Sequence, residues 1–197
     1  MRWSMEEEER AMWSIRLLAS WLMVVVGLIG TTVPAAAAST GAPARDVFVA
    51  TANLSGRQEV PPVLDTSGSG VAVYRLSPDG TALQCTLVAV QFMTPPVMAH
   101  IHASAPPGVN APVVAHLFPP NAHSSCSSTS TLLLRCEGRI LAGDLEGPLA
   151  GQPLSALIAM MATGNSYTNV HTTRHPGGEI RGQNQPLVNL SVPSVRI

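Results

Sequence analysis

The sequence predicts an all-β fold: an antiparallel β-sandwich of Greek-key type with one short helix. Three observations carry this prediction. Short runs of alternating apolar and polar residues, the pattern of half-buried strands, recur along residues 47–185. Glycine- and proline-rich stretches separate these runs and supply the turns that join strands. Only one segment has apolar residues at helical spacing. A chain of 197 residues is long enough for one domain with a hydrophobic core and too short for two comfortable ones.

The first strands alternate clearly. The stretch "VFVATANLSG" places Phe48, Ala50, Ala52 and Leu54 on one face of a strand. The stretch "SGVAVYRLSPDG" is a strand that ends in a Pro-Asp-Gly turn, and "TALQCTLVAVQF" continues after it, so the pair predicts a hairpin.

The later elements follow the same pattern with one exception. We predict strands in "VMAHIH", "APVVAHLF", "TLLLRCEGRI", "SYTNVHTT" and "GGEIRGQN". The exception is "GQPLSALIAMMATGN", where Leu154, Leu157, Ile158 and Met161 have helical spacing and Gly164 is suited to end the helix. This segment is the predicted short helix.

The N-terminal region has the parts of a secretory signal. Arg16 precedes an apolar run from Leu17 to Ile29, and the small residues of "VPAAAAS" follow as a cleavage site. The glutamates of "MEEEER" do not suit a positive leader, so Met12 is an alternative start, and an uncleaved anchor is an alternative to cleavage. We expect a secreted or periplasmic protein without an integral membrane span after cleavage. The expected organisation is a signal peptide over 1–38, a linker over 39–46, a domain over 47–185 and a C-terminal tail over 186–197.

The charges after the predicted leader are few and balanced. This part of the chain has eight arginines, eight acidic residues and no lysine, so it has no basic cluster. A near-neutral surface of this kind argues against nucleic acid and against anionic lipid as partners.

The three cysteines suggest one disulfide. Cys126 and Cys136 flank a short Ser/Thr-rich and apolar segment, and we expect them to pair in an exported protein. Cys85 shares an alternating apolar face with Leu83 and Leu87, which predicts a buried free thiol rather than a nucleophile.

Two histidines stand at metal-ligand spacing. His100 and His102 lie two residues apart on a predicted strand, so both imidazoles leave the same face while Ile101 faces the other way. Such a pair binds one metal ion only if a neighbouring strand supplies a third ligand. The alternative is a hydrogen-bonded structural pair on a half-exposed strand.

Several stretches together resemble the CHRD domain, named from chordin, an extracellular antagonist of bone morphogenetic proteins. They are "FVATANLSGRQEVPPV", "AHIH", "GVNAPVV", "GDLEGPLAG" and "NVHTTRHPGGEIRGQ", in this order from about Phe48 to Gln183. The resemblance implies an extracellular module with an unidentified protein partner, and it implies no particular chemistry. Because "AHIH" and "VHT" are both motif segments, the resemblance brings forward His171 as the third metal ligand.

A weaker resemblance is to the Cu/Zn superoxide dismutase sandwich, in which an H-x-H pair is followed by further histidines and a Gly-rich segment with an arginine. It implies a superoxide dismutase-like fold, with His116 as an additional candidate ligand and Arg181 near the metal. Neutral imidazole suits copper or zinc. Against this likeness, no lysine is present to steer superoxide, and His116, His123 and His175 are better explained as solvated loop or strand residues than as ligands.

Two function hypotheses result. The leading one is a non-catalytic extracytoplasmic binding or structural module, because no nucleophile–base pair or paired carboxylates form a recognisable catalytic motif. The alternative is a copper or zinc protein with ligands His100, His102 and His171, with metal carriage or redox chemistry as its role. Glu59, Glu179 and Arg181 are predicted to form structural ion pairs that join the first and last strands.

Overall fold

The computed structural model describes residues 48–129, 131 and 133–187. The predicted signal peptide and linker, and the tail from residue 188 onward, lie outside these residues. Within them the protein is all-β with antiparallel strands and one α-helix, so the predicted fold class is confirmed. In this described part of the chain, no helix is long and apolar enough to cross a membrane.

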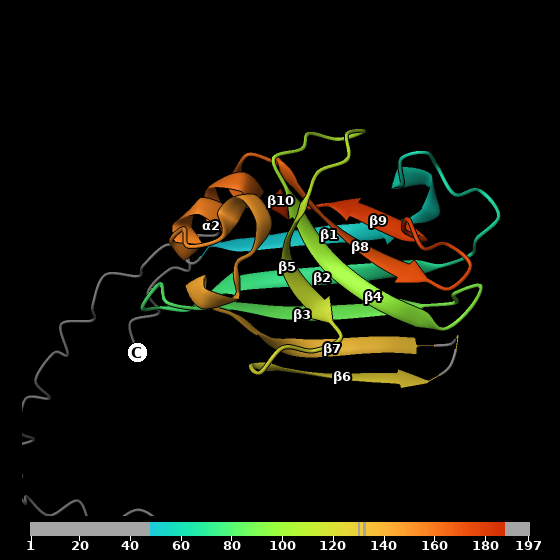
Figure 1. The fold of residues 1–197 in the computed structure, drawn as a ribbon, viewed down its shortest axis with the longest axis horizontal. Coiled ribbons are helices and arrows are strands. Elements are labelled where there is room, and N and C mark those ends of the chain that lie inside the picture. Colours follow the sequence, from blue (N-terminus) through green and yellow to red (C-terminus); the bar gives the residue numbers. More distant parts are fainter. Residues whose placement is uncertain (1–47, 130, 132, 188–197) are drawn as a thin grey trace, which may run out of the picture. The chain divides into compact units, whose positions relative to one another are not determined.

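Ten strands form one antiparallel sheet that folds over on itself. Its strand order is β5-β4-β8-β9-β1-β2-β3-β7-β6, with β10 paired to β1. Figure 1 shows β5, β4 and β8 crossing in front of β1, β2, β3 and β7, so that the two parts of the sheet enclose the core. The strands are β1 (Val49–Ser55), β2 (Ser69–Leu76), β3 (Leu83–Val90), β4 (Pro96–Ala103), β5 (Val113–Phe118), β6 (Ser124–Thr129), β7 (Leu133–Ile140), β8 (Ser166–Thr172), β9 (Ile180–Gln183) and β10 (Gln185–Pro186).

Four short helical elements join these strands. They are the 3-10 turns η1 (Gly56–Gln58), η2 (Ala142–Asp144) and η3 (Gly147–Leu149), and the helix α2 (Leu154–Ala162). The helix buries Leu154, Leu157 and Met161, as their spacing predicts. It ends at Ala162, and two residues later Gly164 has a φ of 68°, which favours glycine, and donates its N–H to the carbonyl of Met161.

The core follows the alternation in the sequence. In β1 the side chains of Ala50, Ala52 and Leu54 are at most 3 % exposed, while Asn53 between them is exposed. Strands β2 and β3 pair as the predicted hairpin, from Ser69 opposite Val90 to Leu76 opposite Leu83. Alternating burial therefore places one face of this layer inside.

The cysteines behave as predicted. A disulfide joins Cys126 of β6 to Cys136 of β7, which lie directly opposite each other in the pairing of these strands. Cys85 is free and buried, and burial raises the pKa of its thiol to about 11. A thiol in this state is a packing residue rather than a nucleophile at neutral pH.

Strands β4 and β8 are buried on both faces. Ala99, Ile101 and Val170 face the core and are fully buried. The opposite face carries histidines and other polar side chains, and these are buried as well, whereas the sequence suggested a half-exposed row. Residues of the loops 104–112 and 173–178 bond to this polar face and cover it.

Candidate metal centre

Strand pairing places the histidines of β4 beside the polar residues of β8. In this register Met98 lies opposite His171, His100 opposite Asn169 and His102 opposite Tyr167. Side chains two residues apart on a strand share a face, so His100, His102, Asn169 and His171 all project from one side of the two strands. The neighbouring strand that the pair requires is therefore β8.

The three candidate ligands form one compact cluster. His100, His102 and His171 each offer a ring nitrogen, and these nitrogens lie within 4.8 Å of one another. The shortest separation joins His100 Nδ1 to His171 Nε2 at 3.2 Å. All three side chains are buried, with exposed fractions of 5 %, 8 % and 7 %.

Backbone carbonyls fix one nitrogen of two rings. His102 Nδ1 lies 2.7 Å from the carbonyl oxygen of Ala111, and His171 Nδ1 lies 2.9 Å from that of Pro176. A carbonyl only accepts, so in each ring Nδ1 carries the proton. Burial lowers the pKa of both histidines, so the rings are neutral and Nε2 of each holds a free lone pair. Metal-binding histidines in proteins are typically held in this manner.

Asn169 faces both lone pairs. Its side-chain oxygen lies 3.1 Å from His102 Nε2 and 3.1 Å from His171 Nε2. In this orientation the amide oxygen faces two unprotonated ring nitrogens, an arrangement that suits a cation. In the absence of a cation, turning the carboxamide by 180° brings its NH₂ group against the two nitrogens and satisfies both. The "NVH" stretch could have signalled Asn169, because a residue two positions before His171 must share its face.

His100 has a buried nitrogen without a partner. When its Nδ1 donates to His171 Nε2, its own Nε2 makes no hydrogen bond and is shielded from solvent. Burial, with smaller contributions from the neighbouring histidines, lowers the pKa of His100 to about 3. The ring is therefore neutral and keeps a lone pair available for a metal.

The cluster fits a copper or zinc ion after a small adjustment. Ligands bonded to one zinc ion at about 2.0–2.1 Å lie roughly 3.3–3.6 Å from one another. The separations here extend up to 4.8 Å, so the most distant pair must close by roughly 1 Å.

The other candidate histidines lie outside the cluster. The His116 ring is 4.7 Å from that of His100, but its Nε2 is 3.0 Å from the Glu146 carboxylate and the side chain is 46 % exposed. His123 contacts Asp144, and His175 lies 3.5 Å from Asp65. His116 is thus a neighbour of the set rather than a member.

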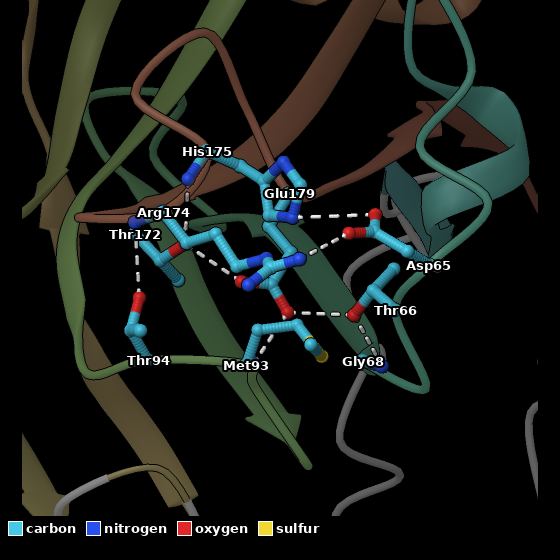
Figure 2. A network of polar contacts seen from close by, with 9 residues as sticks. All are labelled: Asp65, Thr66, Gly68, Met93, Thr94, Thr172, Arg174, His175 and Glu179. Carbon is cyan, nitrogen blue, oxygen red and sulfur yellow. Dashed lines mark hydrogen bonds and ion pairs between the residues drawn. The ribbon is translucent and has the colours of Figure 1, made fainter.

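A polar network holds the loop that carries Pro176. The buried carboxylate of Glu179 accepts hydrogen bonds from Thr66 Oγ1, Thr172 Oγ1 and the Met93 N–H at 2.6–2.8 Å. Figure 2 shows this network, in which Arg174 and His175 also reach Asp65. Because the loop is fixed at both ends, its carbonyl can orient His171.

The predicted ion pairs around Arg181 take a different form. Among the described residues, neither Glu59 nor Glu179 lies within 4.0 Å of the Arg181 guanidinium. Its N–H groups donate to the Val109 carbonyl and to Asn110 Oδ1 instead. Glu59 and Arg181 interact electrostatically at longer range: burial raises the pKa of Glu59, and the charge of Arg181 partly offsets this rise.

One aromatic ring connects Arg181 with the cluster. The Tyr167 ring is stacked on His102 with centroids 4.5 Å apart, and the Arg181 guanidinium lies 3.4 Å from the Tyr167 centroid. The contact between Arg181 and Tyr167 is a cation–π interaction. Sequence reasoning did not identify Tyr167, because its role depends on the pairing of β4, β8 and β9.

The fold and this cluster define an all-β, sandwich-like domain with a buried histidine set on the outer face of one layer. Comparison with protein families assigns the class more closely: the CHRD domain matches residues 50–184. The chain belongs to the CHRD-domain family. Comparisons with curated proteins and with solved structures give no match.

Proposed function

We propose that this CHRD-domain protein binds one copper or zinc ion through His100, His102 and His171. The observation that carries the proposal is a set of three buried imidazoles whose ring nitrogens lie within 4.8 Å of one another. The carbonyls of Ala111 and Pro176 hold Nδ1 of His102 and of His171 protonated, which leaves Nε2 of both rings unprotonated. Ligand side chains that are already oriented in the metal-free protein lose little conformational entropy when the ion binds, so the free energy of binding is more favourable.

The donor set is all nitrogen, which suits copper and zinc and disfavours calcium or magnesium, since these ions prefer oxygen ligands. Three imidazoles would leave a fourth position, for which Asn169 Oδ1 is a candidate because it lies 3.1 Å from Nε2 of both His102 and His171. Redox activity of a copper form remains a prediction, to be tested by a superoxide assay on the loaded protein.

We further propose that the domain acts outside the cytoplasm, as an extracytoplasmic module that can also contact other proteins. The Cys126–Cys136 disulfide supports this location, because disulfides persist in oxidising compartments.

The test is metal binding measured by competition with a chromophoric chelator, for Cu²⁺ and for Zn²⁺ separately. We expect one equivalent for the wild type and a loss of affinity on the order of 100-fold or more for His102→Ala and His171→Ala, because each removes a direct ligand. His123→Ala is the matched control, since this histidine lies outside the cluster, and it should bind like the wild type. Circular dichroism of each metal-free variant verifies that it is folded.

For Cu²⁺, nitrogen hyperfine coupling in the electron paramagnetic resonance spectrum should report three imidazoles in the wild type and two in His171→Ala. Absence of stoichiometric binding in the wild type, or equal binding by all four proteins, would refute the metal site.

A further inference from the structure

A pocket of about 380 Å³ lies between η1 and the loop that contains Pro107 and Gly108. Its walls combine apolar surface with polar side chains, of which three are charged: Arg57, Glu59 and Arg181. Glu59 and Arg181 belong to the buried part of the protein, with exposed fractions of 5 % and 1 %. A pocket whose walls contain charged side chains can recognise a ligand by its charge.

The positive charge in this pocket is not neutralised by direct contact. Within the part of the chain that the structure describes, no carboxylate lies within 4.0 Å of Arg181, whose recorded acceptors are the uncharged Val109 and Asn110. Burying a guanidinium without a carboxylate in direct contact is unfavourable, and the Glu59 carboxyl acts on Arg181 only at longer range. Arg57 adds a second, exposed cation at the same pocket. The walls therefore favour an anionic group.

One oxygen of the Glu59 carboxyl group, in contrast, lacks a hydrogen-bond donor. Its Oε1 is buried and has no hydrogen-bond partner. The carboxyl group packs against Gly178, where any Cβ atom would collide with it, so a glycine is required at this position. Burial raises the pKa of Glu59 to about 7, with partial opposition from Arg181. Glu59 thus lacks a donor in the same pocket in which Arg181 lacks an anionic acceptor.

The motifs of the sequence meet at this pocket. The metal centre uses only "AHIH" and "NVHTT", whereas "GRQEVPP" supplies Arg57 and Glu59, "GVNAP" supplies the acceptors of Arg181, and "GEIRGQ" supplies Arg181 itself. Three stretches that are far apart in the chain converge on a site that the proposed metal function does not use.

We propose that this pocket binds a small carboxylate with an N–H group on the adjoining carbon, the chemistry shared by free α-amino acids and by the C-terminus of a peptide. The carboxylate pairs with the exposed Arg57 in the field of the buried Arg181, and the N–H donates to the carboxyl group of Glu59. An apolar side chain of the ligand packs on Val60 and Pro62, which also line the pocket. This proposal is independent of the metal centre.

The test is an NMR titration of the ¹⁵N-labelled protein with three probes. L-Valine has both groups, N-acetyl-L-valine keeps the carboxylate and an amide N–H, and L-valinamide lacks the carboxylate. We expect the amide signals around Glu59 and Gly108 to shift with a dissociation constant on the order of 1 mM for at least one carboxylate probe. Stronger binding of L-valine indicates a free amino acid, and stronger binding of N-acetyl-L-valine indicates a peptide C-terminus.

Arg57→Ala should weaken binding at least tenfold, and because this side chain is exposed the variant should keep its fold. Arg139→Ala removes an exposed arginine from β7 and is the matched control, with binding like the wild type. Glu59→Gln should weaken L-valine more than N-acetyl-L-valine, because it removes the charge that pairs with an ammonium group. The proposal is overturned if neither carboxylate shifts the pocket signals, if L-valinamide binds equally well, or if Arg57→Ala binds like the wild type.

Discussion

The buried carboxyl of Glu59 should make the stability of the protein fall as pH rises through neutrality. Its pKa is about 7 in the folded protein and 4.5 in its ordinary state, so the folded protein holds this proton more tightly. The resulting stabilisation is complete below pH 4.5 and is lost as pH rises to 7. A difference of 2.5 pKa units corresponds to about 3 kcal/mol of unfolding free energy.

The assay compares urea unfolding of the wild type and Glu59→Gln at pH 5 and at pH 8. The glutamine side chain does not titrate, so relative to this variant the wild type should lose about 2.5 kcal/mol between the two pH values, slightly less than the full amount because pH 5 lies above 4.5. Taking the difference between the proteins removes other titrations, in particular those of the buried histidines. The lowered pKa values of these histidines act in the opposite direction, because stability is lost as pH falls below about 6.5.

Glu137→Gln is the control, because this carboxylate is about half exposed on β7 and should give the same difference from the wild type at both pH values. If the free-energy difference between wild type and Glu59→Gln is equal at pH 5 and pH 8, Glu59 titrates normally and the assignment of a buried, poorly compensated carboxyl is wrong.

Two further perturbations probe the framework. Replacing Cys126 and Cys136 by serine should lower the unfolding free energy by about 3 kcal/mol, because the disulfide closes a loop with a sequence separation of 10, and reductant should produce the same loss in the wild type; an unchanged denaturation midpoint would contradict this. Tyr74→Phe should cost about 1–2 kcal/mol in the same assay, since the Tyr74 hydroxyl lies 2.6 Å from Thr168 Oγ1, which itself donates to Asn184, and this buried bond joins the two layers. A variant as stable as the wild type would show that this bond adds nothing to the packing of the layers.

Local periodicity was sufficient to predict most strands and the helix, but not β6, whose Ser/Thr-rich sequence has no apolar alternation. The apolar faces of β1 and α2 follow from spacings of two residues and of three to four residues, and Ala52 and Leu157 are buried accordingly. The shared face of His100 and His102 has the same origin. The juxtaposition with His171 needed the family resemblance, because strand pairing is a long-range property that no local pattern encodes.

What covers a face could not be predicted in this way. The alternation of side chains along a strand predicts that His102 faces away from Ile101. That the face of β4 carrying His102 is buried depends on the loop 104–112, which folds over it. The same limit applies to Arg181. Its predicted partners were Glu179, two residues away, and Glu59, which lies in another motif of the family. The hydrogen bonds of Arg181 go instead to the loop 104–112, at Val109 and Asn110.

Each of the two proposed sites contains a buried polar atom that has no hydrogen-bond partner. A buried polar atom without a partner costs about 1–3 kcal/mol, so folded proteins leave few of them. Among the described residues, the buried side-chain atoms without a hydrogen bond are His100 Nε2, Glu59 Oε1 and His175 Nε2, and the last lies 3.5 Å from Asp65. The first belongs to the metal cluster and the second to the pocket with Arg181. Binding a cation at one and an N–H donor at the other would recover the stability that the unliganded fold gives up there.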